Sequence, residues 1–445
     1  MKKSVGILLV LVLLAAVPLA ASADVPAPEG PFDTAFRIQN LGSAAANCEF
    51  SFYDASGVEK YASGGLSPIP VGDSAYIYVP SDTTVADGQY AGVVTCDQEV
   101  AAVVNFADPD SGASYSGVTE PGATLYAPGI YDNYYSFYSN IVAQNASGGA
   151  IDITLEIFEP GNSTPVKTET KTNVAANGYV TFEQEGLPEL NDNQFYSAKV
   201  TGVGGNVAAV VNIYGRGGSD DKLFSYNPFP SGSTLAYAPV IMNAYYGYNT
   251  ALVIQNLGAS DANVTITYSD GTVKNTTIGP GAADSRYTPA ETGLPSGASG
   301  LLAAKVESTN GQPIVVLVNE DNNFNRAASY NGFAAGTKTV RAPIVMKRYF
   351  KYNTSVTCQN VGSAAATMTI AYGGVAGTNT SPSIAVGDSH LFLQQTDSLL
   401  SDGWIGSATV TSAEDIVCIV NEDMNEAPES TQVMDQLFAY NGIGQ

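Results

Sequence analysis

The chain has 445 residues, a formal net charge of −24 and only 13% charged residues. Nothing in so acidic a chain could neutralise phosphates, which excludes nucleic acid as a partner and argues against anionic membranes. The apolar content of 44% is enough for packed cores, and the length favours several domains over one.

The first residues have the order of a secretory signal peptide. Lys2 and Lys3 precede an apolar run over residues 7–19, and the small residues Ala21-Ser22-Ala23 follow it. The run is short for a membrane span, and Pro18 interrupts it. We therefore expect removal of residues 1–23, and a secreted protein, extracellular or on the cell surface, with no membrane span after cleavage.

Three anchors recur four times in the same order. They are a Gln-Asn pair that ends an apolar alternating segment, an asparagine that ends a later apolar run, and a tyrosine that opens a closing triplet. The copies are Gln39-Asn40, Gln144-Asn145, Gln255-Asn256 and Gln359-Asn360; Asn105, Asn212, Asn319 and Asn421; and Tyr115, Tyr226, Tyr330 and Tyr440. Such self-similarity indicates tandem domains. We predict four repeats, at 24–122, 123–233, 234–337 and 338–445.

Within each repeat the apolar residues alternate with a period of two, which indicates strands. The dipeptides Asp270-Gly271 and Asn310-Gly311 mark turns in the third repeat. The strands predicted there are 252–256, 264–268, 272–278, 284–288, 301–308 and 314–319. Seven or so short antiparallel strands fit an Ig-like sandwich. The predicted fold is all-β, with four tandem Ig-like antiparallel β-sandwich domains in an elongated array.

The four cysteines fall in the terminal repeats. Cys48 and Cys96 belong to the first repeat, and Cys358 and Cys418 to the last. Cys48, Cys358 and Cys418 align with apolar core positions of the other repeats, as a buried bridge requires. In an exported chain this predicts the disulfides Cys48–Cys96 and Cys358–Cys418.

A phrase containing Ala-Pro precedes an aromatic cluster at the start of each of the last three repeats. This Ala-Pro phrase covers residues 125–130, 237–242 and 341–346 and is missing before the first repeat. The candidate junction or binding aromatics are Tyr131, Tyr134, Tyr135, Tyr245, Tyr246, Tyr248, Tyr349, Phe350 and Tyr352. Flexible linkers are Gly/Ser-rich or charged, so these segments are expected to pack. Burial at domain contacts, stacking on sugar rings and contacts between neighbouring copies all remain open.

A search for catalytic chemistry finds little. The one histidine, His390, has no counterpart in the other repeats. No nucleophile elbow, zinc-binding helix, phosphate-binding loop or zinc-spaced Cys/His set occurs. Nothing singles out a pair of carboxylates across a cleft. We therefore expect a protein that is not an enzyme and needs no cofactor.

Calcium is the only metal ion that the sequence suggests, because calcium binds oxygen ligands such as those of acidic loops. Weak candidates are Glu320, Asp321, Glu422 and Asp423, which follow the second anchor in two repeats. Their spacing and type vary among the copies, which favours solvated acidic loops.

Residues 237–256, followed by Ala262 to Tyr268, resemble a repeat of tandem Ig-like surface proteins, which are exported and mostly uncharacterised proteins of filamentous bacteria. The resemblance covers essentially the whole mature chain. It implies a place on the cell surface or in an extracellular matrix, and it carries over no catalytic residue.

These observations predict a structural protein of a surface layer, sheath, filament or adhesive stalk. Its expected partners are further copies of itself or other cell-surface components. The alternative is an extracellular protein that binds polysaccharide through the tyrosine clusters.

Overall fold

The computed structural model describes residues 7–13, 31–108, 111–215, 222–322, 326–424 and 437–445. Nearly every element in these ranges is a β-strand, and the helical ones are three-residue 3-10 turns such as Val79–Ser81 and Thr288–Ala290. No helix within these ranges has the length and apolarity needed to cross a membrane. The protein is an all-β chain with several separate antiparallel sheets, as the alternation predicts.

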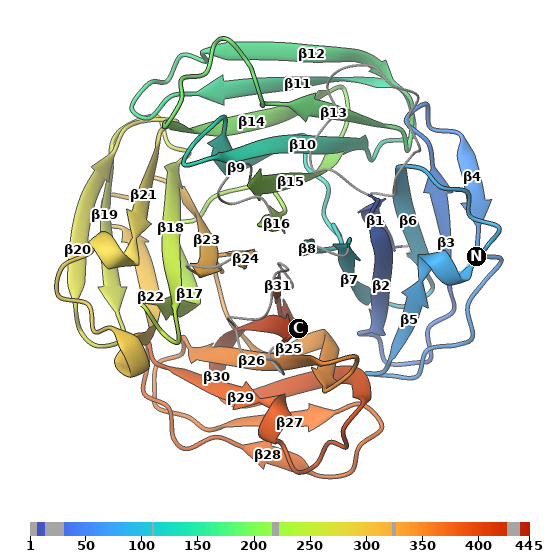
Figure 1. The fold of residues 1–445 in the computed structure, drawn as a ribbon, viewed down its shortest axis with the longest axis vertical. Helices are drawn as coiled ribbons and strands as arrows, with labels where there is room; N and C mark the ends of the chain where they lie inside the picture. Colours follow the sequence, from blue (N-terminus) through green and yellow to red (C-terminus); the bar gives the residue numbers. More distant parts are fainter. Residues whose placement is uncertain (1–6, 14–30, 109–110, 216–221, 323–325, 425–436) are drawn as a thin grey trace. The chain divides into compact units, whose positions relative to one another are not determined.

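The second and third repeats each contain two four-stranded sheets with the same strand order (Figure 1). In the second repeat the orders are β12-β11-β14-β9 and β13-β10-β15-β16, and in the third they are β20-β19-β22-β17 and β21-β18-β23-β24. The strands of the second repeat are β9 (Thr124–Tyr131), β10 (Phe137–Asn145), β11 (Ile151–Phe158), β12 (Lys167–Val174), β13 (Tyr179–Glu183), β14 (Phe195–Val203), β15 (Val207–Gly215) and β16 (Leu223–Tyr226). Those of the third are β17 (Leu235–Met242), β18 (Tyr248–Asn256), β19 (Ala262–Tyr268), β20 (Val273–Ile278), β21 (Ala283–Tyr287), β22 (Leu301–Ser308), β23 (Ile314–Asn322) and β24 (Ala327–Asn331).

The first repeat follows the same plan, with the orders β4-β3-β6-β1 and β5-β2-β7-β8. Its strands are β1 (Ile7–Leu13), β2 (Asp33–Asn40), β3 (Cys48–Tyr53), β4 (Glu59–Ala62), β5 (Ser74–Tyr78), β6 (Tyr90–Cys96), β7 (Val100–Ala107) and β8 (Gly112–Ser116). In the fourth repeat one long strand, β30, pairs with strands of both layers. The strands there are β25 (Thr337–Lys347), β26 (Tyr352–Asn360), β27 (Met368–Tyr372), β28 (Thr378–Thr380), β29 (Ser389–Leu393), β30 (Trp404–Met424), β31 (Leu437–Asn441) and β32 (Ile443–Gly444).

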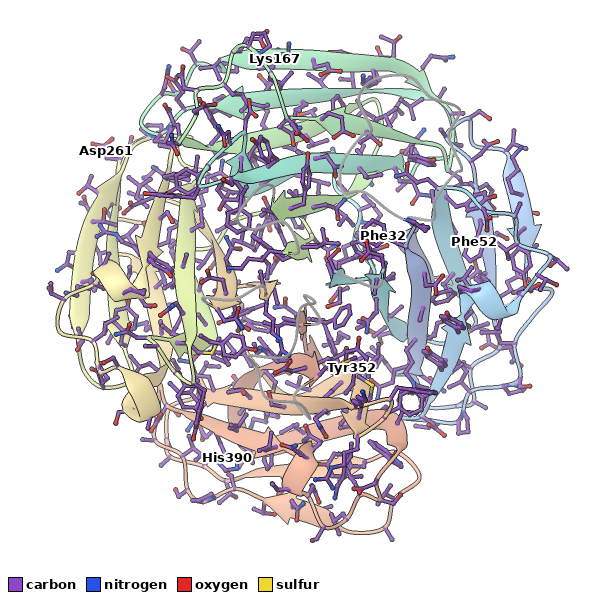
Figure 2. All side chains as sticks on the ribbon, in the orientation of Figure 1. Phe32, Phe52, Lys167, Asp261, Tyr352 and His390 are labelled. Carbon is purple, nitrogen blue, oxygen red and sulfur yellow. A yellow bond between two sulfur atoms is a disulfide. The ribbon has the colours of Figure 1, made fainter. Side chains whose placement is uncertain are left out.

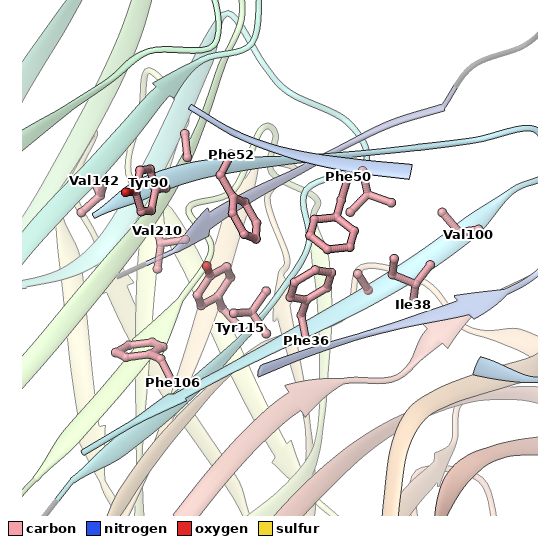
Figure 3. Packing of buried hydrophobic residues seen from close by; sticks show 14 of the residues in the cluster. Phe36, Ile38, Phe50, Phe52, Tyr90, Val100, Phe106, Tyr115, Val142 and Val210 are labelled. Atoms are coloured by element: carbon pink, nitrogen blue, oxygen red, sulfur yellow. The ribbon is translucent and has the colours of Figure 1, made fainter. Parts of the chain in front are cut away.

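The core of each sandwich is built from the inward positions of both sheets. In the first repeat, Phe36 of one sheet meets Phe50 of the other edge-on, with ring centroids 5.1 Å apart (Figure 3). Phe52 packs against both rings. Aromatic pairs of this geometry contribute about 1 kcal/mol beyond their buried area.

The Ala-Pro phrase forms the first strand of the last three repeats, β9, β17 and β25. Each of these strands lies at a sheet edge or beside the two-residue strand β32, where proline is tolerated. The pairing of each strand shifts register at the proline, for example between Ala127 and Ile130 in β9.

The tyrosine of the third anchor holds this bulge. The Tyr226 hydroxyl donates to the carbonyl of Gly129 at 2.9 Å and accepts from its N–H at 3.2 Å. Tyr330 makes the same two bonds with Val240, and Tyr440 makes them with Ile344. The anchors therefore recur because they fasten the first strand of a repeat to its last.

The Gln-Asn pair fastens two loops. The Asn256 amide donates to the carbonyls of Ser260 and Ile278, both at 2.8 Å, and its oxygen accepts from the N–H of Gly258 at 2.8 Å. Asn40, Asn145 and Asn360 make the same three kinds of bond in their own repeats. All four asparagines are fully buried.

We expect Asn256→Ala to destabilise the third repeat by about 3 kcal/mol, because three hydrogen bonds are lost and one of them is a buried bond to the carbonyl of Ile278. Since a four-repeat chain need not unfold in one step, native-state hydrogen exchange of peptides from β18 and β19 is the suitable measurement. Asn275→Ala, at an exposed position of β20, is the matched control and should change stability by less than about 0.5 kcal/mol. If the two substitutions lower stability equally, the hydrogen bonds of Asn256 to the two loops do not stabilise the repeat.

Both disulfides have the pairing that the alignment of the repeats predicts. Cys48 and Cys96 lie opposite each other on β3 and β6, and Cys358 and Cys418 on β26 and β30. Each bridge therefore joins neighbouring strands of one sheet. Two disulfides indicate folding in an oxidising compartment.

The chain divides into two compact units, one containing Met1–Ile157 and Val166–Pro230 and the other Phe158–Pro165 and Ser231–Gln445. Within the first unit, Val142 and Val210 of the second repeat join the core cluster of the first repeat. Within the second, Tyr248 of the third repeat packs against Leu437 and Ala439 of the fourth. The repeats of each unit thus contact one another directly.

Candidate functional site

Six of the nine predicted aromatics lie in the turn between the first and second strands of the last three repeats, and the other three, Tyr131, Tyr248 and Tyr352, lie at the ends of the flanking strands β9, β18 and β26. This aromatic turn covers residues 132–136 in the second repeat, 243–247 in the third and 347–351 in the fourth. Each turn ends in a tight hairpin. In the third repeat, for example, Tyr245 and Tyr248 exchange two backbone hydrogen bonds of 3.0 and 2.9 Å.

The two central residues of each hairpin have a left-handed backbone. Tyr246 and Gly247 have φ of 47° and 86°, as a type I′ turn requires. The equivalent pairs are Tyr135-Ser136, with φ of 51° and 66°, and Phe350-Lys351, with 48° and 74°. Asparagine and glycine are the residues that suit these positions, and a bulky aromatic residue there is a true outlier.

In every turn, the aromatic residue with the left-handed backbone is also the one whose side chain is exposed. Tyr135 is 71% exposed, Tyr246 71% and Phe350 77%. Each stands edge-on to the preceding tyrosine, with ring centroids 4.8 Å apart. Backbone strain persists where the surrounding structure imposes it, and it gathers at functional sites. Each of these three residues is therefore the strongest candidate contact point of its own repeat in the described chain.

A buried polar network holds each turn in place. In the third repeat the Thr250 hydroxyl accepts a hydrogen bond from the N–H of Met242 at 2.8 Å, and the Thr288 hydroxyl donates one to the carbonyl of Met242 at 2.6 Å. Ser139 with Gln184, and Thr354 with Gln394, occupy the same places in the other two repeats. The exposed ring is thus presented by a rigid base.

The remaining candidate aromatics serve the fold. Tyr131 is buried, and burial raises the pKa of Tyr134 and Tyr245. Tyr352, labelled in Figure 2, packs against Phe438 with ring centroids 5.9 Å apart. The sequence marks all nine aromatics alike, because nothing in it except the Tyr246-Gly247 dipeptide indicates a left-handed turn.

We expect Tyr246→Asn to leave the protein about 1 kcal/mol more stable than Tyr246→Ala. Both changes remove the ring contact with Tyr245, but only asparagine is suited to φ of 47°. Chemical denaturation of the two variants, compared by the transition that includes β17 and β18, measures the difference. If the two variants are equally stable, the ring does not strain the turn.

The acidic residues considered for calcium lie in strands and not in solvated loops. Glu320 and Asp321 belong to β23, and Glu422 and Asp423 to β30. Protein side chains engage them, since the Asn421 amide donates to Glu320 and Arg326 pairs with Asp423. Among the residues with described positions, no three His, Cys, Asp or Glu side chains gather to hold a metal ion.

Glu320 is fully buried in β23, and this burial raises the pKa of its carboxyl to about 8. Its Oε1 atom lacks a hydrogen-bond partner. No pattern in the sequence indicates this burial, because a Glu-Asp-Asn run after an apolar strand is typical of a surface loop.

His390 lies on β29 (Figure 2) and packs edge-on against Phe392, with ring centroids 4.5 Å apart. Its partial burial lowers the pKa of the imidazole. His390 is therefore a packed side chain on an edge strand.

No known family model matches the chain, and no curated protein sequence is significantly similar to it. One solved structure, the crystal structure of Thermotoga maritima 1070, is 21% identical, with a TM-score of 0.20 over 23% of this chain and 94% of the other. Another, the BSP domain of a biofilm associated protein, is 10% identical, with a TM-score of 0.15 over 93% of this chain and 90% of the other. At these scores neither likeness bears on function.

Proposed function

We propose that this protein is an exported, non-catalytic structural component of the cell surface or extracellular matrix, which makes its contacts through the aromatic turns. The observation that carries the proposal is the threefold occurrence of an exposed aromatic ring on a strained, rigidly supported hairpin. Two disulfides and the secretory order of the first residues support export.

The rest of the described chain supports a structural role. The repeated anchors fasten loops and strands to one another, Glu320 accepts a hydrogen bond from Asn421, and His390 packs against Phe392. Repeats within a unit share apolar contacts, which suits a load-bearing assembly. We therefore propose further copies of the chain, or other surface components, as its partners.

A second candidate function is the binding of polysaccharide by the same rings. The three turns have different charges, with Asp132 in one and Arg348 and Lys351 in another, so the aromatic ring is the feature that they share. A ligand common to all three must be recognised by that ring. The apolar face of a pyranose is such a ligand, and so is an apolar patch on a neighbouring copy.

The experiment compares the mature chain with the triple variant Tyr135→Ala, Tyr246→Ala and Phe350→Ala. Light scattering over a range of concentrations, with and without calcium, measures self-assembly, and co-sedimentation with insoluble polysaccharides measures glycan binding. Tyr287→Ala, at a tyrosine that is 39% exposed on β21, is the control.

The proposal expects concentration-dependent assembly that the triple variant loses and the control keeps. Loss of polysaccharide binding in the triple variant, with no assembly in any sample, would favour the second candidate. A strict monomer that binds no polysaccharide would overturn both.

A further inference from the structure

The first strand of the first repeat, β1, is formed by residues of the expected signal peptide. Residues Ile7–Leu13 pair with β6 in seven consecutive antiparallel steps, from Ile7 opposite Cys96 to Leu13 opposite Tyr90. These residues are the apolar part of the leader. If the leader is cut after Ala23, as the proposed export requires, β6 keeps its pairing with β3 and becomes an edge strand on its other side.

The leader strand also lacks a feature that the other first strands share. β9, β17 and β25 each shift register at an Ala-Pro step, and the third-anchor tyrosine bonds to the residue after the proline. The pairing of β1 with β6 has no register shift. Tyr115 is the corresponding tyrosine of the first repeat.

The full Ala-Pro phrase is missing before the first repeat, but a segment with the pattern of its Ala-Pro step occurs between the leader strand and β2. Val25-Pro26-Ala27-Pro28 has the pattern of Leu125-Tyr126-Ala127-Pro128 and of Val340-Arg341-Ala342-Pro343. In the latter two segments the first and third residues are buried and the second is partly exposed. Valine and alanine at positions 25 and 27 suit the buried places, and proline at position 26 suits the outward place of an edge strand.

The spacing fits a first strand joined directly to β2. Ala127 lies 17 residues before Gln144, whereas Ala27 lies 12 residues before Gln39. The five missing residues correspond to the aromatic turn, which the first repeat does not have. In the second repeat the turn brings Tyr131 and Ser139 within hydrogen-bond distance, 3.0 Å. The corresponding positions are Pro31 and Thr34, whose separation of three residues is that of a β-turn.

We propose that cleavage of the leader is followed by exchange of strands. Residues 24–30 of the mature chain take the place of Ile7–Leu13 on the edge of β6, in the register of β9. The leader holds the sandwich of the precursor together, and the mature N-terminus closes the edge that could otherwise recruit a strand from another protein.

Hydrogen exchange of β6 in a chain that begins at Asp24 tests this proposal. The amides of β6 that point away from β3 should exchange at least roughly tenfold more slowly in this chain than in one that begins at Pro31. Because the deletion could disturb folding, Ala27→Asp and Pro26→Asp provide a second comparison. The buried position 27 should lose the protection and the outward position 26 should keep it.

Equal protection of β6 in all four chains would overturn the proposal. Protection that falls on dilution, together with dimers in sedimentation, would also overturn it, since the strand would then come from a second copy. The mass of the exported protein separately shows whether the leader is removed. An uncut leader would contradict the proposed export while leaving the result on the chain that begins at Asp24 intact.

Discussion

Glu320→Gln is expected to make the second unit more stable at pH 8 and above, and to leave its stability almost unchanged near pH 4.5. The Glu320 side chain is fully buried between strands of the sandwich, where Asn421 of the fourth repeat donates to its carboxylate. Burial raises the pKa of this carboxyl from 4.5 to about 8. Glutamine keeps an acceptor for Asn421 and carries no ionisable proton.

The sign follows from proton linkage. Between pH 4.5 and about 8, the folded protein keeps a proton on Glu320 that the unfolded chain has released. Stability therefore falls as the pH rises through this range and becomes constant above it. A rise in pKa from 4.5 to about 8 corresponds to about 5 kcal/mol, which is the largest difference that we expect between the free energies of unfolding of the two proteins.

The measurement is urea denaturation of both proteins at several pH values, read as the difference between them at each pH. Glu183, whose pKa burial raises to about 7, contributes equally to both proteins and cancels. A difference that does not change with pH would show that Glu320 ionises in the folded protein as it does in the unfolded chain.

The sequence predicts the regular parts of this fold well, because they depend on local alternation. In the third repeat the segments 264–268, 272–278 and 301–308 correspond to β19, β20 and β22 with at most two residues of difference at an end. The Gln-Asn anchor is also visible in the sequence, since the same buried loop clamp is needed in every repeat.

The features that the sequence does not show depend on contacts far apart in the chain. The Ala-Pro phrase looks like a linker because proline is rare in strands, and only the hydroxyl of a distant residue such as Tyr226 explains the bulge. Glu320 looks like a surface residue because charged side chains are seldom buried, and its partner Asn421 lies in the next repeat. The left-handed backbone of Tyr135 has no local signal at all.

The disulfides join residues far apart in the chain, and yet they can be predicted from the sequence, because the other repeats show which residues stand at the same positions. Cys358 and Cys418 occupy a cross-strand pair that in the third repeat is formed by Ile254 and Val316. Position and burial could be read from aligned repeats, and the bond then follows from proximity. The same alignment supplies a variant that removes the bond and preserves the packing.

We expect the double variant Cys358→Ile and Cys418→Val to lower the stability of the fourth repeat by about 4 kcal/mol. The bond closes a loop with a sequence separation of 60 residues, and in the chain-entropy model its loss gives the unfolded state that much additional freedom. The introduced side chains are those that the third repeat has at these two positions, so no cavity should form. Urea denaturation of the variant, compared with the oxidised and the reduced parent protein, separates the cross-link from the packing. The variant should match or exceed the reduced parent, and a variant as stable as the oxidised parent would show that the bond contributes nothing beyond the contact of two apolar side chains.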